Sequence, residues 1–286
     1  MSAAELIRDP AAWQARCLEA RQAGRRLALA PTMGFLHQGH LSLMREARVR
    51  AGPGGLSLAT IFVNPSQFGP NEDLARYPRD LAGDLAKCAR AGVDLVLAPE
   101  RPDQLYPSGF QTWVEVTGLS QGLCGARRPG HFRGVATVVT KLLNLTRPHL
   151  ALFGEKDWQQ LQIVKALARD LDMGVEIVGM PTIREPDGLA LSSRNAYLSP
   201  EERGRALSLS RALLEARDRA AGGQRDAAAL AAGARWRLEE AGARVDYVEV
   251  VHPETLEPSP RAVPGSRMLV AAFVGKTRLI DNLDLP

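Results

Sequence analysis

The segment Pro31–His40 contains two histidines and two glycines, and the types and spacing of these residues could support chemistry. His37 and His40 are three residues apart, so at the start of a helix they would lie on one side. Gly34 and Gly39 allow a tight turn and a close approach to a ligand. A helix that starts near Gly39 would direct free N–H groups and its positive dipole end at an anion. Two imidazoles there suit stabilisation of charge on a transferring phosphate.

The flanking segments indicate which elements position these residues. Before them, residues 26–30 form a short apolar run of the kind that makes a buried parallel strand. After them, apolar residues recur at helical spacing from Leu41 to Ala47. The ten residues therefore cross from a strand to a helix, which is where open α/β sheets bind ligands.

Two further segments that follow apolar runs carry polar groups. Phe62–Pro70 contains Gln67, which could bind a hydroxyl together with a carboxylate or an amide. Phe153–Gln160 contains Lys156, a point charge for phosphate, and Asp157, which could bind a ribose hydroxyl or cap a helix. For Gln67 a solvated turn residue is the alternative.

Two further loops add basic side chains. Leu191–Asn195 follows the turn Pro186-Asp187-Gly188, and its serines and Arg194 suit closure over a polyphosphate, with Arg194 stabilising charge. A capping loop is the alternative. Gly125–Gly134 carries three arginines that could hold a carboxylate or phosphate, or form a solvated basic loop. Separately, Asp80 or Asp84 could contact Mg²⁺, and a solvated or helix-capping carboxylate is the alternative.

Composition favours a cytoplasmic enzyme. The 286 residues, 45% hydrophobic and 24% charged, suffice for one large domain and a smaller one. A net charge of +4 suits a binder of anionic metabolites without excluding nucleic acid. Cys17, Cys88 and Cys124 are far apart and odd in number, which indicates reduced thiols. The first ten residues do not resemble a signal peptide, and no apolar run approaches the ~20 residues that cross a bilayer.

Apolar patterning predicts alternating strands and helices up to about residue 180, which is typical of a Rossmann-like, doubly wound parallel sheet. The expected strands are 26–30, 56–63, 93–97, 112–116, 150–153 and 175–178, and the expected helices are 11–23, one from about 39, 81–91, 132–145 and 158–171. Beyond Met180-Pro181 the pattern changes to two helices, 200–221 and 226–241, and strands at 245–250, 268–274 and 277–281. We therefore expect domains 1–182 and 183–286, the second a smaller α+β domain.

The string His37-Gln38-Gly39-His40 resembles the "HIGH" signature of the adenylyl-transferring superfamily that includes class I aminoacyl-tRNA synthetases. The longer string from Pro31 resembles, more specifically, the pantothenate synthetase (pantoate–β-alanine ligase) family. Four later stretches match that family's pattern in order, and their joint occurrence is more specific than any one of them. They are 64–79, 125–133, 153–160 and 181–198.

The resemblance implies an ATP-dependent ligase. Such an enzyme condenses (R)-pantoate with β-alanine to pantothenate through a pantoyl adenylate, releases AMP and pyrophosphate, and uses Mg²⁺. It implies a cytoplasmic homodimer that binds neither nucleic acid nor membrane, with 1–182 binding ATP and pantoate and 183–286 forming a lid. The implied catalytic residues are His40, His37, Lys156 and Arg194.

The resemblance also implies individual binding residues. Gln67 and Gln160 would hold pantoate, and Gln67 would also serve β-alanine. Asp84 is the first candidate for the metal ligand and Asp80 the second. The implied ATP site consists of Met33, Gly34, Phe35, Leu36, His37, Gln38, Gly39, His40, Gly154, Glu155, Lys156, Asp157, Ile183, Leu191, Ser192, Ser193 and Arg194.

Two other functions stay open from the sequence. A nucleotidyltransferase with the same histidine pair would be expected to lack the Gln67 and Gln160 pair, and its product would keep the adenylyl group. A non-catalytic RNA-binding relative of the tRNA synthetases would need clustered basic residues and exposed aromatic side chains for stacking. Only 5% of the residues are aromatic, and no such platform is visible in the sequence.

Overall fold

The computed structural model describes residues 4–70 and 72–286, which form two compact units. The main break falls between Pro181 and Thr182, and two short earlier segments also join the second unit. The first unit comprises Met1–Ser120, Arg128–Glu155 and Ile163–Pro181, and the second comprises Gln121–Arg127, Lys156–Gln162 and Thr182–Pro286.

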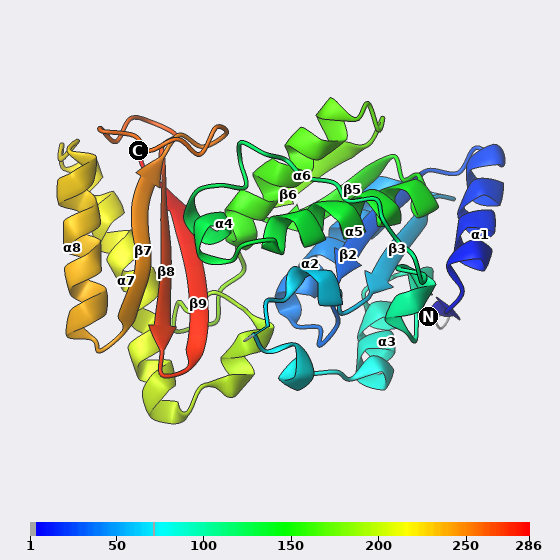
Figure 1. The fold of residues 1–286 in the computed structure, drawn as a ribbon, viewed down its shortest axis with the longest axis horizontal. Helices are drawn as coiled ribbons and strands as arrows, with labels where there is room; N and C mark the ends of the chain where they lie inside the picture. The colour runs from blue at the N-terminus through cyan, green and yellow to red at the C-terminus, as the bar shows by residue number, and fades with distance from the viewer. Residues whose placement is uncertain (1–3, 71) are drawn as a thin grey trace. The chain divides into compact units, whose positions relative to one another are not determined.

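The first unit contains a six-stranded sheet in the order β1-β4-β3-β2-β5-β6, in which every pair is parallel (Figure 1). This confirms the predicted doubly wound sheet. The strands are β1 (Glu5–Ile7), β2 (Leu27–Thr32), β3 (Leu56–Ile61), β4 (Leu95–Leu97), β5 (Leu150–Gly154) and β6 (Glu176–Met180).

Helices cover both faces of this sheet. Helices α2 (Gln38–Ala51) and α3 (Leu81–Arg90) pack with Ala28 and Ala30 of β2 in one core cluster. Leu27 and Leu29 are also fully buried and alternate with those alanines, so they face the other side. There α5 (His131–Thr146) contacts β2 and α1 (Pro10–Gln22). Helix α6 (Trp158–Asp170) begins in the second unit and ends in the first.

The strand order reverses at the β2–β5 pair. The chain moves outward from β2 through β3 to β4, then returns to place β5 on the other side of β2. Ligands of open α/β sheets bind outside the carboxyl ends of the strands at such a switch point. The segment Pro31–His40, called the signature loop below, leaves β2 there. Gly154 is the last residue of β5, the strand beside β2, and Lys156 follows it closely in the chain.

The second unit contains an antiparallel sheet, β7-β8-β9, with two long helices (Figure 1). Its core joins leucine and alanine side chains of the helices to those of the strands. A capping box starts α7: the Ser199 hydroxyl accepts from the Glu202 N–H, and the Glu202 carboxylate accepts from the Ser199 N–H. The elements are α4 (Leu123–Arg127), α7 (Pro200–Ala221), α8 (Ala227–Glu240), β7 (Arg244–Val251), β8 (Arg267–Val274) and β9 (Thr277–Asp284).

One predicted strand, 112–116, is wrong. Its valines, threonine and tryptophan have high strand propensity, but such a segment forms a strand only where a neighbouring strand can pair with it. Within the described residues this segment has no strand partner; the Val114 N–H donates instead to the Thr137 hydroxyl at 3.0 Å, and Trp113 is 43% exposed. The pattern also missed β1 and α4, which are only three and five residues long. In the part of the chain that the structure describes, no helix is long and apolar enough to span a membrane.

Candidate active site

The signature loop turns through two left-handed residues before α2 begins. Gly34 has φ of +84° and Phe35 has φ of +48°. A Cβ on Gly34 would lie 3.0 Å from the Ile61 side chain and 3.1 Å from a carboxylate oxygen of Asp84. Both the conformation and the space therefore require glycine at this position.

The two signature histidines cap the start of α2 with their Nδ1 atoms. Nδ1 of His37 accepts from the Gly39 N–H at 3.2 Å, and Nδ1 of His40 accepts from the His37 N–H at 3.3 Å. The ring centroids are 4.0 Å apart. A neutral imidazole that accepts at Nδ1 carries its proton on Nε2. The caps therefore fix both rings as Nε2–H donors, which is the form that binds phosphate oxygens at a helix start.

Asp84, the first candidate metal ligand, has surroundings that do not fit a magnesium site. Asp84 is 1% exposed, and its two oxygens accept the N–H groups of Phe35 and Leu36, each at 2.7 Å. Asp80 caps α3 by accepting from the Gly83 N–H at 3.0 Å. Magnesium keeps several waters and contacts phosphates, which a buried carboxylate held by backbone amides does not allow. Among the described residues, no three His, Cys, Asp or Glu side chains are grouped to hold a metal.

Hydrogen bonds at both the oxygen and the nitrogen of its side-chain amide hold Gln67 in place. It is only 9% exposed. Its Oε1 accepts from Asn64 Nδ2 at 3.0 Å, and its Nε2 donates to the sulfur of Met33 at 3.3 Å. Met33 belongs to the signature loop, so the first unit brings Gln67 beside the loop, as the position of both at strand ends predicts.

Two side chains of the basic loop, 125–133, hold the backbone of Gln67. The Gln67 carbonyl accepts from His131 Nδ1 at 2.8 Å and from Arg128 Nη2 at 3.3 Å. Arg128 also makes a two-pronged ion pair with Glu72, at 2.5 and 2.6 Å. Burial raises the pKa of Glu72, but the hydrogen bonds and charge of Arg128 outweigh this and the pKa is lowered. The carboxylate that Arg128 holds is thus the chain's own.

Helix α5 touches the backbone next to Gln67 at a glycine. Asn64 Nδ2 donates to the Gly134 carbonyl at 3.2 Å. A Cβ on Gly134 would lie 2.3 Å from the Ser66 carbonyl oxygen and 2.7 Å from the Gln67 nitrogen. Only glycine lets the helix approach this closely. Asn64, His131 and Gly134 were missed as functional residues, since nothing in their local sequence shows that they converge on Gln67.

Replacing Gly134 with alanine should therefore lower stability, together with affinity for the pantoate that the sequence resemblance expects Gln67 to hold. The added methyl group overlaps backbone atoms, which cannot rotate away, and overpacking of this kind costs about 1–3 kcal/mol. Thermal unfolding and the KM for pantoate measure the two effects. Gly204→Ala is the matched control, because a Cβ there meets nothing within 4 Å. An unchanged melting temperature and KM in Gly134→Ala would contradict the close approach.

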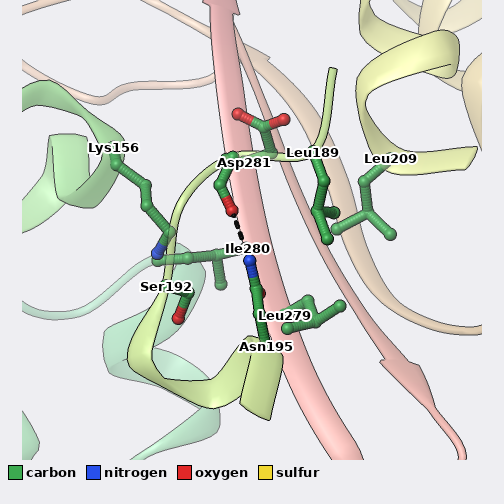
Figure 2. Close-up of a pocket in the computed structure, with 9 residues that line it drawn as sticks. Lys156, Leu189, Ser192, Asn195, Leu209, Leu279, Ile280 and Asp281 are labelled. Carbon is green, nitrogen blue, oxygen red and sulfur yellow. Dashed lines mark hydrogen bonds between the residues drawn. The ribbon is translucent and has the colours of Figure 1, made fainter. Parts of the chain in front are cut away.

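In the second unit, Lys156 and Ser192 line one small pocket. Figure 2 shows both side chains at the pocket, together with Asn195 and Asp281. The Lys156 side chain is 18% exposed, and its Nζ lies 3.9 Å from an oxygen of Asp157. The Lys156 carbonyl accepts from Asn282 Nδ2 at 2.8 Å, which fixes the backbone from which the ammonium extends.

The loop that carries Ser192, Ser193 and Arg194 is held by its own backbone. The Leu191 N–H donates to the Ile183 carbonyl at 3.0 Å, and the Glu185 N–H donates to the Leu189 carbonyl at 2.8 Å, so residues 183–191 form a short hairpin. The Ser192 hydroxyl then caps the next turn by accepting from the Arg194 N–H at 3.2 Å. The hairpin is therefore an ordered support for the two serines and the arginine.

Gln159 and Gln160 follow Lys156 on the first turn of α6. Gln159 is buried and binds the second unit's own backbone: it accepts from the Cys124 N–H at 3.0 Å and donates to the Gly122 carbonyl at 2.9 Å. Gln160 is half-buried. The predicted residues thus divide between the units. The signature loop, Gln67 and Gly154–Glu155 belong to the first, while Lys156, Asp157, Gln160, Ile183 and Leu191–Arg194 belong to the second.

The three cysteines are buried and unpaired. Burial raises the pKa of the Cys17 and Cys88 thiols to about 12, so both stay protonated and unreactive near neutral pH. Cys17 and Cys88 are therefore not candidate nucleophiles.

Comparison with known proteins gives one consistent result. A family model described as pantoate-beta-alanine ligase matches residues 5–284. The pantothenate synthetase of Anaeromyxobacter dehalogenans (strain 2CP-C) is 70% identical over 289 residues, covering 100% of both chains. That of Myxococcus xanthus (strain DK1622) is 64% identical over 267 residues, covering 93% of this chain and 90% of the relative.

Solved structures agree with the sequence relatives. The crystal structure of pantothenate synthetase from Thermus thermophilus matches with a TM-score of 0.92 and 47% identity, covering 99% of this chain and 100% of that one. The pantoate-beta-alanine ligase of Francisella tularensis, complexed with beta-gamma ATP and beta-alanine, matches with a TM-score of 0.79 and 31% identity, covering 98% and 97%.

Proposed function

Because the chain belongs to the pantoate–β-alanine ligase family, we propose that the signature loop and the Lys156 and Ser192 segments carry out that family's reaction. The chain is an ATP-dependent ligase that joins pantoate to β-alanine through a C–N bond. The product is pantothenate, formed by way of a pantoyl adenylate with release of pyrophosphate and AMP. The observation that carries the assignment of roles is the pair of capped histidines, whose Nε2–H groups stand at the start of α2.

The reaction has two steps. The pantoate carboxylate attacks the α-phosphate of ATP, and pyrophosphate leaves. The β-alanine amine then attacks the acyl carbon of the adenylate, and AMP leaves. We propose that His37 and His40 donate hydrogen bonds to phosphate oxygens, and that Lys156 and Arg194 stabilise the negative charge that develops. Orienting the reactants can supply about 7–11 kcal/mol of the barrier reduction, so binding groups carry much of the catalysis.

The remaining roles follow from family membership and the chemistry of the side chains. Met33–His40, Gly154–Asp157, Ile183 and Leu191–Arg194 would bind ATP. Gln160 would hold pantoate together with Gln67, which would also contact β-alanine. Mg²⁺ would enter with the nucleotide and be held mainly by its phosphates, since the buried Asp84, which accepts two backbone N–H groups, does not fit a metal ligand.

Exchange of pyrophosphate into ATP, with pantoate and Mg²⁺ present and β-alanine absent, tests the adenylate step. Pantoate-dependent exchange is expected, and addition of β-alanine should then give AMP and pantothenate. Folded protein that shows no exchange would contradict the ligase assignment. A product that keeps the adenylyl group would instead support a nucleotidyltransferase, and steeply salt-dependent RNA binding would support the RNA-binding alternative.

Replacing Gln67 with alanine should raise the KM for pantoate more than it lowers kcat. Its amide is held by Asn64 and Met33 and can offer both a donor and an acceptor to pantoate. Loss of a neutral hydrogen bond costs about 0.5–1.5 kcal/mol, and a donor or acceptor left unpaired costs about 1–3 kcal/mol. We therefore expect a KM about 10-fold higher in pantoate titrations. The exposed Gln22 of α1 supplies the control, Gln22→Ala, and an unchanged pantoate KM would remove Gln67 from the site.

We also propose that the protein is a cytoplasmic homodimer. Family membership supports the dimer, and three unpaired cysteines fit a reducing compartment. Analytical ultracentrifugation across a range of concentrations measures the oligomeric state, and a monomer at all concentrations would contradict the proposal.

A further inference from the structure

We propose that Asp84 is a positioning residue that holds the signature loop in its ligand-binding conformation, and that it does not bind the metal. The proposal rests on the function proposed above, because the loop it positions is the one that binds ATP. In this proposal Asp84 affects kcat through the position of the loop, although its side chain does not contact the substrate.

The geometry is that of an anion enclosed by backbone amides. Consecutive N–H groups, those of Phe35 and Leu36, donate to the two oxygens of the Asp84 carboxylate, each at 2.7 Å. The same carboxylate lies against Gly34, 3.1 Å from where a Cβ would stand. Successive N–H groups in a turn with left-handed residues form a concave anion site. Here the anion comes from the chain itself.

This contact offsets a strained backbone. Phe35 has φ of +48°, a left-handed conformation that is unfavourable for a residue with a side chain. Hydrogen bonds from an amide to a carboxylate are roughly twice as strong as those between neutral groups. Two of them, made to a residue that is 1% exposed, stabilise the left-handed turn. Without the carboxylate, we expect Phe35 to relax toward negative φ.

The charge of Asp84 is balanced by an ammonium group. Lys87, one turn further along α3, places its Nζ 3.5 Å from Asp84 Oδ1. The same Nζ lies 5.9 Å from the centre of the Phe35 ring. Two amides and one ammonium already surround this carboxylate, which is the environment of a structural anion and leaves no room for the water shell of Mg²⁺.

The loop transmits the position of Asp84 to the histidines. Leu36, whose N–H binds Asp84, is followed directly by His37, the residue that caps α2. His37 in turn donates its own N–H to His40. A shift of Leu36 therefore moves the Nε2–H donors of both rings, and a displacement of about 1 Å at a reacting site can cost about 10²-fold in rate.

Asp84→Asn tests the proposal with almost no change in shape. One carboxylate oxygen becomes an NH₂ group, which cannot accept from a backbone N–H, so one of the two bonds is lost. We expect kcat to fall about 10- to 100-fold, and the Mg²⁺ concentration that gives half-maximal activity to stay unchanged. Asp226→Asn is the matched control: Asp226 caps α8 with one carboxylate oxygen and asparagine can make the same cap, so this variant should behave like the wild type.

A metal ligand would give a different pattern. Its loss would raise the half-maximal Mg²⁺ concentration, and excess Mg²⁺ would restore part of the rate. Either result in Asp84→Asn would overturn the proposal. Adding Phe35→Gly to Asp84→Asn removes the strain at position 35 and should recover part of kcat, judged against Phe35→Gly alone; no recovery would also count against the proposal.

Hydrogen exchange supplies a readout that does not depend on activity. The amides of residues 35 and 36 should exchange slowly in the wild-type protein, equally with and without Mg²⁺, and faster in Asp84→Asn. The hydrogen-exchange comparison does not require catalysis, so it remains valid even if the wild type shows no pantoate-dependent exchange of pyrophosphate into ATP. Failure of the proposed function and failure of the positioning role are therefore distinguishable. Should the variant not fold, Mg²⁺-dependent protection in the wild type alone would overturn the proposal.

Discussion

Replacing His40 with alanine should lower kcat by about 10²–10³-fold while the protein stays folded, because removal of one preorganised donor to a developing charge typically costs that much. His40 Nδ1 accepts the His37 N–H, so its ring presents Nε2–H at the helix start. Steady-state kinetics with ATP and pantoate measure the loss, and circular dichroism checks the fold.

Two conservative variants separate the role of His40 in capping from its role in charge stabilisation. Asparagine places its side-chain oxygen near the position of Nδ1 and can keep the cap, whereas glutamine places its NH₂ group near the position of Nε2 and can keep the donor. We expect His40→Asn to be as slow as His40→Ala and His40→Gln to be faster than both. The reverse order would mean that capping of α2 is the whole contribution of His40.

His252 provides the matched control for these variants. Its Nδ1 also accepts backbone N–H groups, those of Glu254 and Thr255 at 3.3 and 3.2 Å, in an exposed turn of the second unit. His252→Ala should therefore leave kcat unchanged. A comparable loss of turnover in His252→Ala would show that removing such a cap slows the enzyme wherever it occurs.

Local sequence patterns predicted most of the fold because alternation of apolar runs reports directly on strands and helices. They failed where the outcome depends on a distant partner. Residues 112–116 have the composition of a strand, yet no strand among the described residues pairs with them. The assignment of 121–127 and 156–162 to the second unit depends on contacts with residues much later in the chain, such as the bond between Asn282 and Lys156.

In the candidate site, too, the local features could be predicted from the sequence and the features that depend on distant contacts could not. Spacing alone identified the signature loop, because a helix start and a histidine pair are local features. The support of the loop is not local: Asp84 lies 49 residues after Phe35 along the chain. Nothing in the sequence around Asp84 distinguishes a metal ligand from an acceptor of backbone N–H groups, and it is the packing of α3 against the loop that supports the second role. The role of Arg128, which pairs with Glu72, was hidden for the same reason.

Replacing Lys156 with alanine should lower kcat by about 10²–10³-fold, similar to the loss of an oxyanion donor. The Lys156 ammonium is mostly shielded, with 18% of the side chain exposed, and its backbone is fixed by Asn282. A charge in a shielded, fixed position stabilises a transferring phosphate more than a solvated one does. Lys165→Ala, which removes an exposed lysine from α6, is the control and should keep the wild-type rate.

The two half-reactions decide where Lys156 acts. If it stabilises only the transition state of adenylate formation, pantoate-dependent exchange of pyrophosphate and overall pantothenate synthesis should fall by the same factor in Lys156→Ala. Exchange within about threefold of the wild type, a difference of only about 0.7 kcal/mol, would contradict that role. If overall synthesis nevertheless fell, the ammonium would act on the second step, in which AMP leaves, and the charge it stabilises would be that of the departing phosphate.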